Sequence, residues 1–436
     1  MRMPNKLSTE DQLLLLLAQG NLLPRVQEQA LALLATPLRW DLIIERATAQ
    51  EVYPLFYRNL ATLGFPDVPE HARAQLHHLS RINLLRNTLL TEELVRVLKL
   101  LADAGIPTIP LKGVTLAESL YGDSAARVCS DIDILVPRKA VRDAFRILLA
   151  EGFEVYDGKV ESSEIHRLLD SNMEYSFVRG SEGMTFLLEL HWDIAWRWRK
   201  HGLLTDDLWA EAKQKTYWGT QGYALSPEWE LLYLAAHVSH HQWQGLKWLV
   251  DIHEMRASSR MDWEKLRTKA KQLGLEQMLM LTLSACHKLF DTSIPADLLI
   301  TPLPKWMKIF PASTNSANVW ENNFFPTRLF KQPTEKLGYL ARVAFVPTLN
   351  EQRLIALPSF LSFLYYPLRP LRLAGKWSWF VLRAVFGTRD QRAEARGQRA
   401  EISDQASEIG GQTSEIRDQK IAVRDLPSAV RHLGEP

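Results

Sequence analysis

The chain has 436 residues, of which 46% are hydrophobic and 23% are charged, and its formal net charge is +2. This length is enough for two or three domains with sizeable cores. The near-neutral charge argues against a nucleic-acid partner, which would require a large basic excess. Two cysteines, Cys129 and Cys286, are too few for a disulfide framework. No apolar run reaches the length of a membrane span, and no signal-peptide core follows the first residues. We therefore expect a cytoplasmic protein.

Helical patterns fill the first part of the chain, which we expect to form a helical N-terminal region over residues 1–95. Ser8 is a good N-cap residue, because its hydroxyl can accept a hydrogen bond from the first turn of a helix. Apolar spacing and Gly and Pro stop signals predict four helices, over residues 8–20, 24–34, 40–63 and 69–104. The last of these is expected to break near Asn87.

A strand, a turn, a helix and a second strand follow in residues 106–136. The second strand contains Asp131 and Asp133, whose side chains point to the same face because residues alternate along a strand. Two neighbouring carboxylates repel each other unless a cation lies between them. Oxygen ligands of this kind suit Mg²⁺, which also takes oxygens from substrate phosphates. The alternative is a strand with a solvated acidic face.

The turn at Lys112 and Gly113 adds features that suit a phosphate. A glycine allows the backbone to approach closely, and the helix N-terminus that follows attracts an anion. Lys112 supplies a point charge, and Arg127 offers a guanidinium that can bind two phosphate oxygens. Cations, turn and carboxylates together predict a site for a metal ion and a triphosphate.

Three further strands are expected, near residues 153–156, 175–178 and 185–192. In the last of them Glu189 and His191 share one face. An unpaired acid in such a leucine-rich strand would be costly, which favours a functional role for Glu189 over an ordinary ion pair. His191 is interpreted either as a ligand or, more simply, as a partly buried histidine beside Trp192.

A second helical domain is expected over residues 226–300, beginning with the helix start Ser226-Pro227-Glu228. His237 and His241 are four residues apart on one helix face, which is a metal-ligand spacing. With Asp251 they form a candidate transition-metal site. Structural hydrogen bonding between His237 and Asp251 is the alternative.

The chain resembles the uncharacterised nucleotidyltransferases of the DNA polymerase β-like superfamily. The resemblance rests on Leu111-Lys112-Gly113, on Arg127, on the segment Ser130–Val136, on Glu189-Leu190-His191-Trp192 and on the helix from His237 to Asp251. It implies an α/β (α+β) fold in which a small mixed β-sheet, here expected within residues 96–225, is flanked by helical regions. One departure is clear: superfamily members usually carry Gly-Ser where this chain has Lys112-Gly113.

The resemblance also implies an activity, the Mg²⁺-dependent transfer of a nucleoside monophosphate from a nucleoside triphosphate to a hydroxyl-type acceptor. It implies that Asp131, Asp133 and Glu189 hold the metal, with Glu189 acting as the third carboxylate. Nucleotide contacts are expected from Lys112, Gly113, Arg127, Ser130, Lys247 and Asp251. The alternatives are a catalytically inactive nucleotide-binding or scaffold module, and a metal-dependent hydrolase built on His237, His241 and Asp251.

The remaining sequence divides into two segments. Residues 301–387 are irregular and partly helical, and residues 355–386 are apolar and basic, which fits either peripheral contact with an anionic membrane or packing on the helical domain. Pro358, Pro367 and Pro370 argue against one continuous helix there. The tail over residues 388–436 has a seven-residue repeat with a single recurring apolar position, which favours disorder over a coiled coil.

Overall fold

The computed structural model describes residues 7–156, 169, 173–181, 183–194, 205–258, 260–307, 309–310, 325–330, 332–347, 351, 354–355, 357 and 359–386. It divides the chain into two compact units, residues 1–343 and 344–436. The tail repeat falls outside the described residues. The α/β prediction is confirmed: many helices accompany a small mixed sheet.

Four short helices open the first unit: α1 (Thr9–Leu17), α2 (Pro24–Leu34), α3 (Trp40–Ala49) and α4 (Tyr53–Thr62). Ser8 caps α1 as expected, because its side chain accepts a hydrogen bond from the amide of Asp11. The single helix predicted over residues 40–63 was wrong. The chain turns at Glu51, which has a φ of +54°, and Pro54 then lies in the first turn of α4, where a missing N–H costs nothing.

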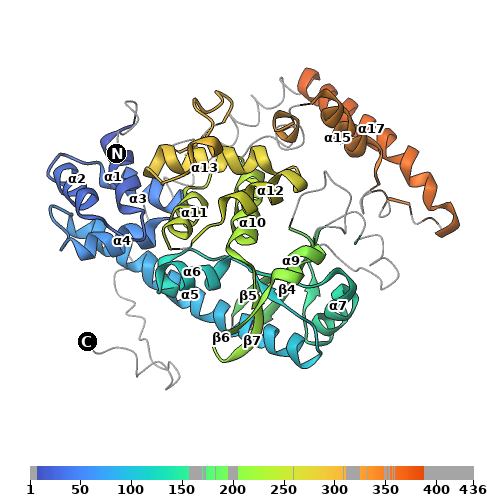
Figure 1. Ribbon diagram of the computed structural model, residues 1–436, viewed down its shortest axis with the longest axis horizontal. Coiled ribbons are helices and arrows are strands. Elements are labelled where there is room, and N and C mark those ends of the chain that lie inside the picture. Colours follow the sequence, from blue (N-terminus) through green and yellow to red (C-terminus); the bar gives the residue numbers. More distant parts are fainter. Residues whose placement is uncertain are drawn as a thin grey trace, which may run out of the picture. The chain divides into compact units, whose positions relative to one another are not determined.

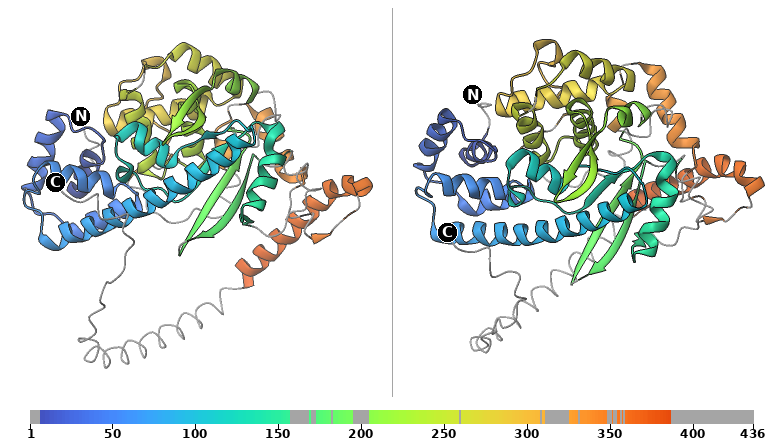
Figure 2. Two further views of the ribbon diagram at one scale, coloured as in Figure 1. Left: turned by 90° about the horizontal axis from the view of Figure 1, so that it is seen from below. Right: turned by 60° about the horizontal axis from the view of Figure 1, so that its bottom comes forward.

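The long helix α5 (Glu70–Asp103) runs on without the break predicted near Asn87 (Figure 2). Asn83 and Asn87 are fully buried there, and their side-chain amides donate to main-chain carbonyls of residues 124–127. These long-range bonds hold both asparagines on the buried face of the helix. The helix also continues across residues 95 and 96, where the sequence suggested the end of the N-terminal region.

The five-stranded sheet has the order β1-β2-β5-β4-β3. Its strands are β1 (Ile109–Pro110), β2 (Ile132–Leu135), β3 (Glu154–Val155), β4 (Glu174–Ser181) and β5 (Met184–His191). Only β2 and β5 pair in parallel, and every other neighbouring pair is antiparallel. Helix α6 (Gly113–Tyr121) and a 3-10 turn, η1 (Ser124–Ala126), connect β1 to β2. After β2, η2 (Arg138–Ala140) leads into helix α7 (Val141–Ala150).

A small hairpin that the sequence did not predict follows the sheet. Helix α9 (Thr205–Glu211) leads into β6 (Lys213–Tyr217) and β7 (Thr220–Ala224), which pair antiparallel. The amide of Tyr223 donates to the carbonyl of Thr108, so the hairpin joins the sheet region next to β1. The tryptophans Trp196 and Trp198, which suggested a substrate cleft, lie outside the described residues.

Four helices complete the main core: α10 (Pro227–His240), α11 (Leu246–Ser258), α12 (Trp263–Leu273) and α13 (Glu276–Phe290). Helix α13 packs against the other three, and Figure 1 shows them gathered as one helical layer. The chain turns between α10 and α11 at Gln242 and Trp243, which both have positive φ values. A short turn, η3 (Ala296–Leu298), follows α13.

The last described elements are η4 (Phe325–Arg328), α15 (Pro333–Phe345), η5 (Ser359–Leu364) and α17 (Tyr365–Phe386). Residues 355–386 do not form one continuous helix, as expected, because η5 precedes α17. Pro367 and Pro370 nevertheless lie within α17, and Pro367 is in its first turn, where no N–H is needed. Arg369 and Arg372 both pair with the buried Glu351. Among the described helices, none combines the length and the apolar character required to cross a membrane.

Candidate active site

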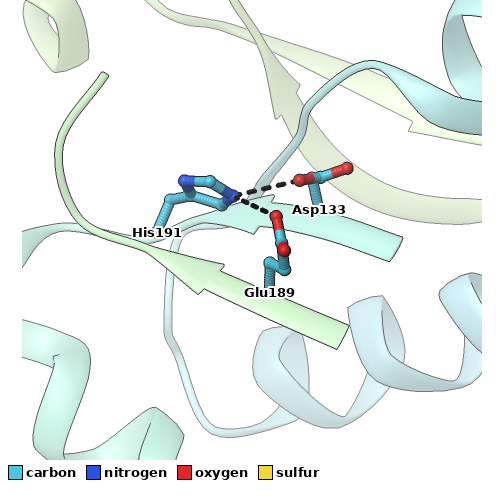
Figure 3. Close-up of side chains that lie close together, drawn as sticks. All are labelled: Asp133, Glu189 and His191. Carbon is cyan, nitrogen blue, oxygen red and sulfur yellow. Dashed lines mark hydrogen bonds and ion pairs between the residues drawn. The ribbon is translucent and has the colours of Figure 1, made fainter. Parts of the chain in front are cut away.

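The parallel pair of strands β2 and β5 brings two acidic residues side by side. Asp133 lies opposite Glu189 in the strand register, and Leu135 lies opposite His191. Because alternate residues point to the same face, the side chains of Asp133, Glu189 and His191 converge on one face of the sheet (Figure 3). Ile132, Ile134, Leu188 and Leu190 point the other way and are buried. The hydrophobic alternation of the two strands therefore sets the position of the acids.

His191 lies between three carboxylates at this point. Its Nε2 lies 3.0 Å from Oδ1 of Asp133 and 3.6 Å from Oε2 of Glu189. Its Nδ1 lies 3.1 Å from Oε2 of Glu174, which faces His191 in the β4–β5 pairing. The imidazole is therefore fixed between carboxylates on both sides.

Lys112 approaches the same carboxylates from the β1–α6 turn. Its Nζ lies 3.1 Å from Oδ1 of Asp133 and 3.5 Å from Oδ2 of Asp131, and the side chain is 9% exposed. Gly113 begins α6 with a φ of +65°, a conformation that favours glycine, and a Cβ there would lie 3.6 Å from the carbonyl oxygen of Asp131. Ser130 donates its hydroxyl to Oδ1 of Asp131 at 3.2 Å. These residues thus lie around the Asp131–Asp133 pair.

The neighbouring carboxylates keep both Lys112 and His191 in their positively charged forms. Burial alone would lower the pKa of Lys112, but the carboxylates of Asp133 and Asp131 outweigh it and raise that pKa well above its ordinary value. Burial opposes the charge of His191 as well, yet Glu174, Asp133 and Glu189 raise its pKa to about 10. In the metal-free protein His191 is therefore an imidazolium at neutral pH.

The pKa values of Glu174 and Glu189 are shifted in opposite directions. Burial tends to raise the pKa of Glu189, but its contacts with His191 and the charge of Lys112 lower it to about 2. Burial dominates for Glu174 and raises its pKa, and the neighbouring charges of Glu189 and Asp133 add to this effect. Glu189 is consequently a permanently charged carboxylate and a weak base, which suits cation binding better than proton abstraction.

The donor set fits a divalent metal ion. Ligand atoms of Asp133, Glu189 and His191 all lie within 4.8 Å of one another. Oδ2 of Asp133 is buried and has no hydrogen-bond partner in the described part of the chain, so an acceptor is available there. Among the described residues, two cations, Lys112 and His191, pair with the carboxylates of Asp131, Asp133, Glu174 and Glu189. This excess of acid is what a bound cation would neutralise.

Arg127 and Asp251 lie in a different place from the one predicted. Nε of Arg127 is 2.9 Å from Oδ2 of Asp251, and the hydroxyl of Tyr121 donates to Oδ1 of Asp251 at 2.8 Å. The side chains of Arg127 and Asp251 are only 3% and 1% exposed. Burial opposes the charge of Arg127, but Asp251 raises its pKa. The guanidinium expected to bind phosphate thus serves a buried ion pair between the loop before β2 and α11.

Lys247 also has protein partners instead of facing an open cleft. Its Nζ lies 2.6 Å from Oε2 of Glu51 and donates to the carbonyl of Val128 at 3.2 Å. Glu51 belongs to the turn between α3 and α4, so Lys247 connects the N-terminal helices to the loop that precedes β2. This placement supports the position of the loop and gives no contact with the carboxylate cluster.

The structure does not assemble the predicted transition-metal site of His237, His241 and Asp251. Asp251 is occupied by Arg127 and Tyr121, and no group of three metal-ligating side chains containing these histidines occurs among the described residues. His241 stacks on Trp248, with ring centroids 4.2 Å apart, and His237 packs edge-on against the same indole. Burial lowers the pKa of both histidines, that of His241 to about 3, which identifies them as neutral packing residues.

Two residues of the site were missed in the sequence. Glu174 was placed just outside its strand, although counting back from the β4–β5 turn sets it opposite His191. Tyr233 lies on α10; its hydroxyl is buried without a hydrogen-bond partner in the described residues. Burial and the charge of Asp133 raise its pKa well above the ordinary value. A tyrosine in an apolar helix carries no sequence signal for such a position.

Comparison with known proteins identifies the family of the chain. The family described as "Uncharacterised nucleotidyltransferase" matches residues 36–291, more than half of the chain. Among solved structures, the chain is similar to an antigenic nucleotidyltransferase-like protein from Paracoccidioides brasiliensis, with 19% identity and a TM-score of 0.29, over 44% of this chain and 91% of that one. No curated protein matches. The chain belongs to the family of uncharacterised nucleotidyltransferases.

Proposed function

We propose that the protein transfers a nucleoside monophosphate from a nucleoside triphosphate to a hydroxyl-type acceptor, using a divalent metal ion such as Mg²⁺. The acceptor oxygen would form a bond to the α-phosphorus while the bond from this phosphorus to the bridging oxygen breaks. Pyrophosphate leaves, and the hydroxyl proton passes to solvent. The observation that carries the proposal is the pairing of Asp133 with Glu189 across parallel strands, with Asp131 and Lys112 beside them.

Asp131, Asp133 and Glu189 would hold the ion, and the lowered pKa of Glu189 suits this role. When bound, the ion supplies Lewis-acid stabilisation of the phosphate charge. Lys112 pairs with the carboxylates and can exchange this ion pair for a contact with a phosphate oxygen. Its positive charge would then take the role that the serine hydroxyl has in other superfamily members. Positioning and charge stabilisation supply most of the rate in such chemistry.

A non-catalytic module is the second candidate, and one observation favours it. Lys112 and His191 already pair with the carboxylates in the absence of a ligand. Such a cluster can persist as a structural network that never binds a metal. Both interpretations agree with the fold, so they must be distinguished by measuring nucleotide binding and nucleotidyl transfer.

Nucleotide binding can be tested with the purified full chain and a thermal-shift panel of ATP, GTP, CTP and UTP, with and without Mg²⁺. A ligand at one hundred times its Kd stabilises the native state by about 2.7 kcal/mol, which gives a measurable shift in Tm. We expect a shift that needs both Mg²⁺ and one triphosphate. It should be absent in Asp133→Asn and Glu189→Gln and retained in Asp143→Asn, whose carboxylate is exposed on α7.

Transfer is then measured as pyrophosphate release, and as movement of an α-phosphate label onto sugar, protein and RNA acceptors. Asp133→Asn should abolish both signals. Nucleotide binding without any transfer would support the non-catalytic module, and retained transfer in Asp133→Asn would refute the assigned site.

A further inference from the structure

Three candidate ligand atoms, one each from Asp133, Glu189 and His191, lie within 4.8 Å of one another. Nε2 of His191 lies 3.0 Å from Oδ1 of Asp133 and 3.6 Å from Oε2 of Glu189. Adjacent ligands of an octahedral ion bound at about 2.1 Å lie about 3 Å apart. The three side chains are therefore close enough to coordinate one ion, with His191 as one of its ligands.

Glu174 lies within ion-pair distance of the second ring nitrogen of His191, although Nδ1 makes no hydrogen bond among the described residues. Its Oε2 lies 3.1 Å from Nδ1 of His191, on the opposite side of the ring from Asp133 and Glu189. Metal-bound histidines almost always donate their other ring N–H to a carboxylate or a carbonyl, which fixes the ring and its tautomer. A histidine that only filled space beside Trp192 would not need carboxylates at both nitrogens.

Asp133 provides a second, independent indication. Its Oδ1 is shared between Lys112 and His191, whereas its Oδ2 is buried and has no hydrogen-bond partner within the described ranges. Buried carboxylate oxygens are rarely left without a partner. An ion in contact with the cluster would satisfy this oxygen without displacing the Lys112 pair.

We propose that the protein binds its divalent cation through Nε2 of His191 together with the carboxylates of Asp133 and Glu189, and that Glu174 positions the imidazole. The proton that Nε2 carries in the metal-free protein leaves to solvent when the cation takes its place. A set of one nitrogen and two oxygens favours Mn²⁺ over Mg²⁺, because Mg²⁺ prefers oxygen ligands alone and imidazole suits transition metals. This deepens the proposed function by naming the ligands and the metal preference of its site.

The decisive measurement is the electron spin-echo modulation spectrum of Mn²⁺ bound to the chelator-treated full chain, with and without a non-hydrolysable nucleoside triphosphate analogue. A directly coordinated imidazole gives ¹⁴N modulation, so the wild-type spectrum alone tests the proposal and depends on no variant. We expect ¹⁴N modulation in the wild type and in His237→Gln, and none in His191→Gln.

Calorimetric titration with Mn²⁺ and Mg²⁺ supplies a second readout. Glu174→Gln should weaken Mn²⁺ binding by about 10- to 100-fold while the ¹⁴N signal remains, because Glu174 acts through His191. His191→Gln should lower the preference for Mn²⁺ over Mg²⁺ at least tenfold.

Two results would overturn the proposal. One is bound Mn²⁺ without ¹⁴N modulation in the wild type, and the other is ¹⁴N modulation that persists in His191→Gln. In either case the nucleotidyl transfer assay is unaffected, so failure of the ligand assignment is distinguishable from failure of the proposed function. Absence of Mn²⁺ binding in the presence of the triphosphate analogue would overturn the ligand assignment and the metal requirement together.

Discussion

Removing Asp251 should destabilise the protein strongly, because it would leave the buried guanidinium of Arg127 without its counter-charge. The two side chains are 3% and 1% exposed, and the Nε–Oδ2 distance is 2.9 Å. Breaking a buried ion pair by removing one partner typically costs about 3–5 kcal/mol. We therefore expect Asp251→Ala to lower the free energy of unfolding by about that amount. Tyr121→Phe, which removes one hydrogen bond to the carboxylate, should cost about 1.5–3 kcal/mol.

A double-mutant cycle separates the ion pair from other effects of the substitutions. Arg127→Met combined with Asp251→Leu replaces both charges with apolar groups of similar size, a change that is often neutral or stabilising at buried pairs. The double variant should therefore be more stable than Asp251→Ala, with a coupling energy of about 2 kcal/mol or more between the two sites.

The assay is urea unfolding followed by circular dichroism, with nucleotide binding measured on the same samples. Destabilisation by Asp251→Ala with nucleotide binding retained in the folded fraction supports a structural pair. A loss below about 1 kcal/mol, accompanied by loss of nucleotide binding, would refute this reasoning and return Asp251 to the nucleotide site.

Three further predictions use the same unfolding assay. Asn87→Ala should lower the free energy of unfolding by about 1–3 kcal/mol, because it removes a buried amide that donates to two carbonyls. The control Thr88→Ala, at an exposed position, should change it by less than about 0.5 kcal/mol. Equal effects of the two substitutions would contradict a stabilising role for the Asn87 hydrogen bonds. Gly113→Ala should cost about 1–2 kcal/mol from its φ of +65°, with no steric term, and an unchanged midpoint would argue against this conformation. Burial lowers the pKa of His253 from 6.5 to about 4, so the stability that depends on the neutral imidazole is fully present above pH 6.5 and is lost as the pH falls toward 4. The free energy of unfolding of the wild type relative to His253→Gln should therefore decrease by about 3 kcal/mol over that range. A difference that stays constant with pH would contradict the pKa shift.

The sheet and its acids were predictable because they depend on local alternation. Asp133 and Glu189 each follow a strand pattern in which isoleucine or leucine alternates with polar residues, and this pattern fixes the face to which they point. That Glu189 lies beside the aspartates was implied only by the family resemblance, since alternation does not say which strands are neighbours. The register of β2 and β5 shows that the two strands are parallel neighbours.

The polar partners of the site were not predictable, because they depend on contacts between distant segments. Lys112 was expected to bind a phosphate, and in the structure it pairs with the carboxylates of Asp131 and Asp133. Arg127 found Asp251, which is 124 residues away along the chain. In both cases the sequence indicated the charged residue and the loop that carries it. A buried charge needs a partner of opposite charge, and the spacing of residues along the sequence does not predict which distant residue supplies it.

The helix errors have the same origin. Asn87 is a weak helix former and suggested a break, but two hydrogen bonds to carbonyls some 40 residues away keep it inside α5. In contrast, the single helix expected over residues 40–63 looked favourable locally and was divided by the turn at Glu51. Tertiary contacts overrode weak local preferences in both directions.

The continuous course of α5 limits how sequences of this family can change in length. Along about 50 Å the helix contacts, among other elements, α4, the carbonyls of residues 124–127 through Asn83 and Asn87, and Arg179 on β4 through Glu93. One inserted residue would rotate everything beyond it by about 100° and would uncouple these contacts. Insertions and deletions among relatives should therefore collect in the loops, leaving the distance between Asn83 and Glu93 unchanged.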